Sequence, residues 1–197
     1  MERGAYIDLM EKALDTEFLQ TRFVKGLDLG FSGSWSKTRR ELSELCALHG
    51  ARLRIVARMP EKDVSGLYDD VLSLITLHGK AQEGVNQVGD LDILMVLTHE
   101  LAHSIQYSVL RAIPRKVYKA HFGQFQNEVR LERAAEDTAF FLALNYFPSL
   151  CRKYKLKKHW FDAYTTKEEI LLIAKRFGFS SQSKEVLEAL NLFVVKN

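Results

Sequence analysis

The chain has 197 residues, of which 47% are hydrophobic and 27% are charged, and its formal net charge is +3. Such a composition excludes a disordered or fibrous protein and predicts a globular domain with a sizeable core. No apolar stretch is long enough to cross a bilayer, and the N-terminal segment lacks the apolar core of a signal peptide. We therefore expect a cytoplasmic protein with no membrane partner, in which Cys46 and Cys151 stay reduced.

Two helices are predicted before residue 50. Apolar residues at helical spacing predict the first helix over about 5–26. The second is predicted over 36–49, with Gly50 as its stop signal. The inward positions expected for this second helix are Leu42, Leu45, Cys46 and Leu48.

The pattern then changes to a period of two, which is typical of strands. Residues 52–58 alternate between apolar and polar side chains, as a half-buried strand does. Within 67–77, Asp69 and Asp70 predict a turn, and residues 71–77 form a β-rich run. A small sheet is therefore expected in the middle of the chain.

Helices are predicted again in the second half. Asp90 or Asp92 is expected to cap a long helix that ends at about Arg111. Another helix is predicted over 127–146, stopped by Pro148. Capping signals predict two shorter helices in the tail, over 167–177 and 183–194.

This order of elements predicts an α+β fold, because two or three strands lie inside a mostly helical chain. We expect one domain over residues 1–150, with N-terminal helices and a small sheet before the long helix. Residues 151–197 are expected to form a helical extension packed on that domain.

The stretch THELAHSIQY, residues 98–107, carries the strongest chemical signal. Residues four apart on a helix share a face, so His99 and His103 can both direct an imidazole at one metal ion. Zinc accepts histidine nitrogen, and a catalytic zinc site uses three protein ligands. Glu100 is then placed to act as general base toward a metal-activated water. Because HExxH also occurs by chance, a purely structural helix without a metal is the alternative.

A third ligand is expected from the helix over 127–146. Glu128, Glu132 and Glu136 follow one another at intervals of four, so they form one stripe. Three stacked acids repel one another unless something positive faces them, and a metal ion would do so. A solvated stripe balanced by neighbouring arginines is the alternative, and the stripe does not decide which acid would be the ligand.

Together these motifs resemble the gluzincin arrangement of zincin metallopeptidases, and most nearly the ImmA/IrrE-type metallopeptidases of bacteria and phages. The resemblance covers about residues 65–145, through SGLYDDVLSLITL, LTHELAHSIQ and ERAAEDTAF. It implies a zincin-like fold and a zinc-dependent peptidase acting on a protein, such as a regulator cleaved at one site. The sequence departs from the family pattern at Glu136, where Asn or Asp is usual.

The family register also implies residue roles. It makes Glu132 the third zinc ligand beside His99 and His103, and it places Glu136 where a side chain orients a ligand histidine. Glu128 and Glu136 remain alternatives to Glu132 as the ligand.

The resemblance further implies a substrate-binding edge at the strand over 71–77, where an extended peptide would pair. A donor to the oxyanion is then needed, and Tyr68, His121 and Tyr107 are the candidates in that order. A packing role is the alternative for each of them.

A second class of function remains open, that of a zincin-fold protein that binds a partner without cleaving it. The basic run 152–158 and a helix-turn-helix-like pattern within 168–190 make DNA an alternative partner. That hypothesis predicts salt-sensitive binding that is lost when Lys153, Lys155 and Lys158 are neutralised.

Overall fold

The computed structural model describes residues 27–31, 35–56, 59, 65–78, 87–111, 116, 125–157, 171, 175, 179–184 and 186–187. In this part of the chain the fold is mixed α+β, with a three-stranded sheet before the helix that carries HELAH, as predicted. The elements are α2 (Trp35–Leu48), β1 (Arg52–Val56), β2 (Gly66–Asp69), β3 (Leu74–His78), α3 (Gln87–Leu110), α5 (Phe125–Tyr146) and α6 (Pro148–Tyr154). The helix predicted over 5–26 lies outside the described residues, as does most of the tail.

Helix α2 ends where the sequence predicted, because Gly50 adopts a left-handed conformation with φ 72°. The N–H of Gly50 donates to the carbonyl of Ala47, and the N–H of Ala51 donates to the carbonyl of Cys46. These two bonds form a Schellman motif, which glycine favours at this position. The predicted inward positions of α2 are buried except Leu48, which is 40% exposed, so the prediction for Leu48 is wrong.

The sheet has the strand order β1-β3-β2, so β3 is its central strand. It pairs parallel with β1 and antiparallel with β2. The turn and strand boundaries predicted for 67–77 are wrong, since β3 begins only at Leu74. Asp69 Oδ1 accepts a hydrogen bond from the N–H of Leu72 at 2.8 Å, and Ser73 has a φ of 50°, so the chain turns through residues 70–73. Val71 consequently lies on that turn and is 78% exposed.

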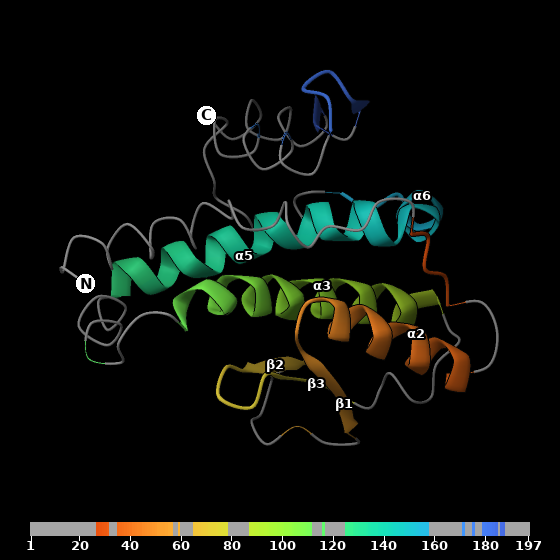
Figure 1. The fold of residues 1–197 in the computed structure, drawn as a ribbon. Helices are drawn as coiled ribbons and strands as arrows, with labels where there is room; N and C mark the ends of the chain where they lie inside the picture. Colours follow the sequence, from red (N-terminus) through yellow and green to blue (C-terminus); the bar gives the residue numbers. More distant parts are fainter. Residues whose placement is uncertain are drawn as a thin grey trace.

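Helix α3 lies between the sheet and α5 in Figure 1, and it forms the centre of the core. Its side toward the core carries Leu94, Leu97 and Leu101, which are fully buried. Ala135 and Ala139 of α5 are also fully buried, and such small side chains let two helix backbones approach closely. Among the described residues, no helix combines the length and the apolar character needed to cross a membrane.

The start of α3 and the segment after α5 differ from the prediction. Helix α3 begins at Gln87, so Asp90 lies in the first turn instead of capping it. There Asp90 accepts a hydrogen bond from the hydroxyl of Tyr154 at 3.0 Å. Helix α5 ends before Pro148 as predicted, but this proline also begins α6, a helix that the sequence did not predict.

The predicted division at residue 150 falls inside α6, where Cys151 packs against the end of α5. Cys46 and Cys151 are free and buried, and burial raises the pKa of each thiol to about 12. Both are therefore thiols at neutral pH.

Candidate metal centre

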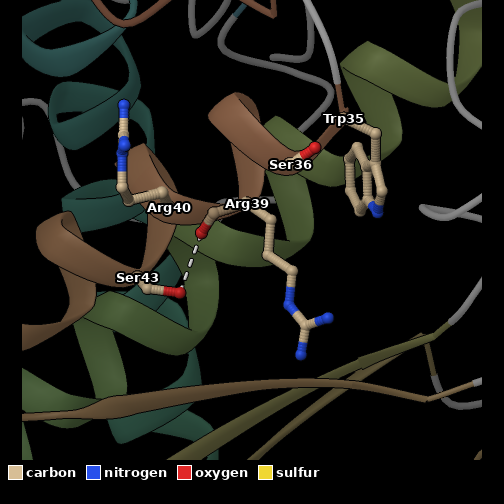
Figure 2. A pocket seen from close by; sticks show the side chains of 5 residues that line it. All are labelled: Trp35, Ser36, Arg39, Arg40 and Ser43. Carbon is tan, nitrogen blue, oxygen red and sulfur yellow. Dashed lines mark hydrogen bonds between the residues drawn. The ribbon is translucent and has the colours of Figure 1, made fainter.

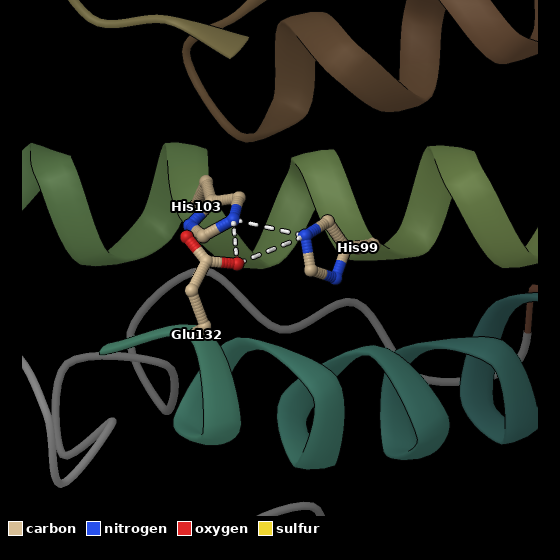
Figure 3. A group of neighbouring side chains, drawn as sticks. All are labelled: His99, His103 and Glu132. Carbon is tan, nitrogen blue, oxygen red and sulfur yellow. Dashed lines mark hydrogen bonds and ion pairs between the residues drawn. The ribbon is translucent and has the colours of Figure 1, made fainter. Parts of the chain in front are cut away.

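Two neighbouring helices bring His99, His103 and Glu132 together, as Figure 3 shows. The Nε2 atoms of the two histidines lie 3.0 Å apart. Glu132 Oε2 lies 3.5 Å from Nε2 of His99 and 3.3 Å from Nε2 of His103. The histidines come from successive turns of α3, and the glutamate reaches them from α5. One nitrogen from each ring and one carboxylate oxygen therefore converge on a single point.

This convergence fits a metal ion. Zinc bound tetrahedrally to histidine nitrogen and carboxylate oxygen at about 2.0–2.2 Å places neighbouring ligand atoms about 3.4 Å apart. The three separations observed, from 3.0 to 3.5 Å, lie on both sides of that value. Three protein ligands also leave one coordination position open, as catalytic sites do.

The acids around the histidines give the site an attraction for positive charge. Burial lowers the pKa of His99, but hydrogen bonds to Glu132 and Glu136 outweigh burial and raise the pKa to about 10. Burial likewise raises the pKa of Glu132, yet its hydrogen bonds to His103 and His99 outweigh burial and lower it. In the absence of a metal, the carboxylates therefore favour the protonated, positively charged form of His99. The same carboxylates would favour a metal cation at this place.

The acids of the α5 stripe contact different nitrogens of the histidine rings, so their expected roles differ. Glu132 faces the Nε2 atoms, whereas Oε1 of Glu136 lies 3.0 Å from Nδ1 on the far side of the His99 ring. That placement is suited to orienting the imidazole rather than to sharing its ligand atom. The side chain of Glu128 lies outside the described residues.

Gln106 also belongs to this site, although the sequence did not single it out. Its Oε1 lies 3.1 Å from Nδ1 of His103, and its Nε2 donates to the carbonyl of Leu131 at 3.0 Å. The signal was present in the spacing, because Gln106 follows His103 by three residues and so shares its face of the helix.

Glu100 lies on the side of α3 that faces the sheet, next to β2. It is 7% exposed, and it accepts a hydrogen bond from the main-chain N–H of Tyr68. Burial raises the pKa of Glu100, and the nearby histidine charges only partly oppose that rise. A carboxylate whose pKa is raised is better matched to proton transfer near neutral pH.

Gly66 allows β2 to approach Glu100 so closely. A Cβ at this position would lie 2.3 Å from Cγ1 of Val96 and 3.0 Å from Oε1 of Glu100. Only a residue without a side chain fits between the strand and α3 here.

The three predicted oxyanion donors are placed differently from one another. The hydroxyl of Tyr68 accepts a hydrogen bond from Arg111 at 2.8 Å, at the far end of α3. The ring of Tyr107 lies between those of Tyr68 and His103, with centroids 5.8 and 6.4 Å away. Tyr107 is therefore closer to the ligand histidines than Tyr68, whose contact with the site is its main-chain N–H. His121 lies outside the described residues.

The strand expected to form the substrate-binding edge is not an edge, because β3 pairs on both sides. Among the described strands, the sheet edge nearest to α3 belongs to β2. His78 donates to the carbonyl of Ser65 at 2.9 Å, and this pair continues the antiparallel register by one step beyond Gly66. Since hydrogen-bonded and non-bonded pairs alternate, the main-chain groups of Gly66 and Tyr68 point away from β3. They face the side on which Glu100 lies.

A cavity of about 210 Å³ adjoins this edge. Its apolar wall comes from Leu77, Ile93 and Val96, and Asp92 lies at its exposed side. Val96 lies one turn before Glu100 on α3, so the cavity lies about one helical turn from the candidate base, which is not part of its lining.

Another cavity, of about 470 Å³, lies beside α2 and has a different character. Figure 2 shows that Arg39 and Arg40 leave the helix in different directions, so their guanidinium groups do not converge on one ligand. Trp35 begins the helix at this cavity, and Ser43 donates to the carbonyl of Arg39 at 2.8 Å. The cavity is therefore a surface depression separate from the candidate metal centre.

No protein-family model, curated protein or solved structure matches the chain. The roles of the site residues must therefore be argued from their own geometry and chemistry.

Proposed function

We propose that the chain is a zinc-dependent metallopeptidase with a zincin-like fold, similar to the ImmA/IrrE-type enzymes. The observation that carries the proposal is the convergence of His99, His103 and Glu132 on one point, with Glu100 buried beside them. A structural helix would not need two imidazoles and a carboxylate from another helix to share one centre. A gluzincin site has this donor set and a base at this position.

Each residue has a defined task in the proposed reaction. His99, His103 and Glu132 hold zinc, which when bound lowers the pKa of water and polarises a peptide carbonyl. Glu100 accepts the proton of the attacking water, while a carbon–oxygen bond forms at the peptide carbonyl. Glu100 then delivers that proton to the departing amine nitrogen as the carbon–nitrogen bond breaks.

The substrate proposed is an extended segment of a protein, such as a regulator cleaved at one site. The outer edge of β2 supports this proposal, because both carbonyls of Gly66 and Tyr68 and the N–H of Gly66 are directed away from β3, while the N–H of Tyr68 is taken by Glu100. A peptide added at that edge would be fixed by main-chain hydrogen bonds. The cavity of about 210 Å³ next to Val96 has room for a side chain adjacent to the cleaved bond.

Replacing the base without touching the metal ligands tests the proposal. Glu100→Gln keeps the side-chain shape and removes the proton acceptor, so we expect about one zinc per chain and a loss of cleavage of about 10²–10⁴-fold. Zinc is measured by elemental analysis, and cleavage is measured by mass spectrometry on a library of unstructured peptides. Glu44→Gln, at an exposed position of α2, is the matched control and should retain both properties.

Two results would contradict the proposal. Cleavage unchanged in Glu100→Gln would exclude Glu100 as the base. A wild-type protein that binds zinc but cleaves neither the library nor any protein added with it would favour a zincin-fold binding protein instead.

A further inference from the structure

Gln106 is buried between α3 and α5, directly beside the candidate ligands, and is 1% exposed. A buried amide costs free energy unless its polar atoms find partners. Gln106 contacts one ligand histidine with its oxygen and the other helix with its nitrogen. We propose that Gln106 is a positioning residue that fixes the tautomer of His103 and the location of Glu132 through a single amide. The inference rests on the proposed metal site.

The orientation of the Gln106 amide follows from its partners. The carbonyl of Leu131 can only accept, so the group that faces it must be the amide NH₂ of Gln106. The amide oxygen of Gln106 therefore faces His103, and an oxygen can only accept. Nδ1 of His103 must then carry the proton that is donated to it, across 3.1 Å.

The tautomer of His103 follows in turn. A neutral imidazole has one N–H and one lone pair, so a proton on Nδ1 leaves the lone pair on Nε2. Nε2 is the atom that lies 3.3 Å from Glu132 and 3.0 Å from His99. In the metal-free protein Nε2 donates to Glu132. When a metal ion takes the place of that hydrogen, the proton that Gln106 holds on Nδ1 leaves the lone pair of Nε2 directed at the centre that the other two ligands share. Without this acceptor, protonation of Nε2 would block the ligand atom.

The NH₂ group of the Gln106 amide binds the opposite helix, α5. The carbonyl of Leu131 belongs to the peptide group that also contains the nitrogen of Glu132. A hydrogen bond of 3.0 Å to that carbonyl therefore fixes the backbone of Glu132 relative to α3. Glu132 is itself 53% exposed at its side chain, so packing alone does not hold it at the centre.

Ser104 supplies a matched control on the same helix. It is 2% exposed, and its hydroxyl donates to the carbonyl of His49 at 3.1 Å, which ties α3 to the end of α2. Ser104→Ala therefore removes a buried inter-element hydrogen bond of α3 that does not contact a ligand histidine.

The experiment measures the Kd for Zn²⁺ by chelator competition, alongside the urea unfolding of each metal-free variant. Gln106→Met keeps the length of the side chain and loses both hydrogen bonds, so we expect zinc binding to weaken about 10–100-fold. Gln106→Glu keeps an acceptor for His103, replaces the donor to Leu131 with a second acceptor oxygen and adds a negative charge. It should therefore bind zinc more tightly than Gln106→Met. Ser104→Ala should lower the resistance to urea and leave the Kd unchanged.

The outcomes separate this inference from the proposed function. Wild-type zinc binding in Gln106→Met, or a loss no larger than that of Ser104→Ala, would overturn the positioning role and leave the metal site standing. Equal weakening in Gln106→Met and Gln106→Glu would overturn the role in fixing the tautomer. A wild-type chain that binds no zinc would overturn both the inference and the proposed function.

Discussion

Two histidine clusters contact both α3 and α5 but have different partners. At one, Nε2 of His49 lies 2.8 Å from the hydroxyl of Tyr146, and the carbonyl of His49 accepts from Ser104. At the other, His99 and His103 face the carboxylates of α5 at 3.0 to 3.5 Å. The first cluster joins α2, α3 and α5 through uncharged groups, whereas the second places carboxylates around the imidazoles.

The difference shows what separates a structural histidine from a candidate ligand. The Tyr146 hydroxyl gives Nε2 of His49 an uncharged partner, so this contact creates no excess of negative charge that would favour a cation. Carboxylates around two imidazoles instead favour an added positive charge, and they raise the pKa of His99 to about 10. Burial alone does not separate the clusters, because His49 and His103 are both buried.

Of the substitutions that test the difference between the two clusters, the one at Glu132 is expected to have the largest effect, and that effect is on metal binding. Glu132→Gln leaves the shape of the site but removes the carboxylate that faces both Nε2 atoms. Because it removes a direct ligand, we expect zinc binding to weaken by at least about 100-fold, beyond the range typical of groups that only orient ligands. Chelator competition measures the Kd.

Glu136→Gln is the control for that change, because Oε1 of Glu136 lies 3.0 Å from Nδ1 of His99, the ring nitrogen that does not face the other ligands. It should cost less affinity than Glu132→Gln. The reverse ranking would make Glu136 the third ligand and would contradict the assignment of Glu132.

A smaller effect, on stability alone, is expected at the other cluster. Tyr146→Phe removes the hydroxyl that contacts His49 and leaves a buried ring nitrogen without that partner. This should reduce the free energy of unfolding by about 1–3 kcal/mol. Zinc binding should stay at the wild-type level. Urea unfolding measures the first property and chelator competition the second; a loss of zinc affinity in Tyr146→Phe would show that the clusters are coupled.

Much of the fold follows from local sequence patterns. The spacing of apolar residues and the stop signal at Gly50 locate α2, and the apolar stripe and Pro148 locate α3 and the end of α5. Such signals act between residues a few positions apart. The sheet was less predictable, because the pairing of β3 on both sides depends on strands distant in the sequence. The substrate-binding edge that the family resemblance implied for the strand over 71–77 therefore falls on the central strand of the described sheet.

The candidate site divides in the same way. A spacing of four places His99 and His103 on one face, so their meeting could be predicted from α3 alone. Glu132 and Glu136 have equivalent spacing on α5, and only the packing of α5 against α3 shows which one faces the Nε2 atoms. Gln106 was missed because an amide acquires its role from partners on two helices.

The smallest effect expected is a dependence of stability on pH in the metal-free protein. The pKa of His99 is about 10 in the folded chain, above the ordinary histidine value of 6.5. Because the pKa of His99 is higher in the folded than in the unfolded chain, the protonated ring stabilises the fold. This stabilisation is complete below about pH 6.5 and is lost as the pH rises toward 10. We therefore expect urea resistance in the presence of a chelator to fall between pH 6.5 and 9.

Variants assign that slope to one cluster. Glu132→Gln should show a shallower fall, because it removes a carboxylate that raises the pKa of His99, while Glu136 still acts on the ring. Tyr146→Phe should be less stable at every pH and keep the wild-type slope, because its hydroxyl faces His49 and not His99. A slope unchanged in Glu132→Gln would mean that the carboxylate does not control the protonation of His99. The contrast between the two clusters would then rest on geometry alone.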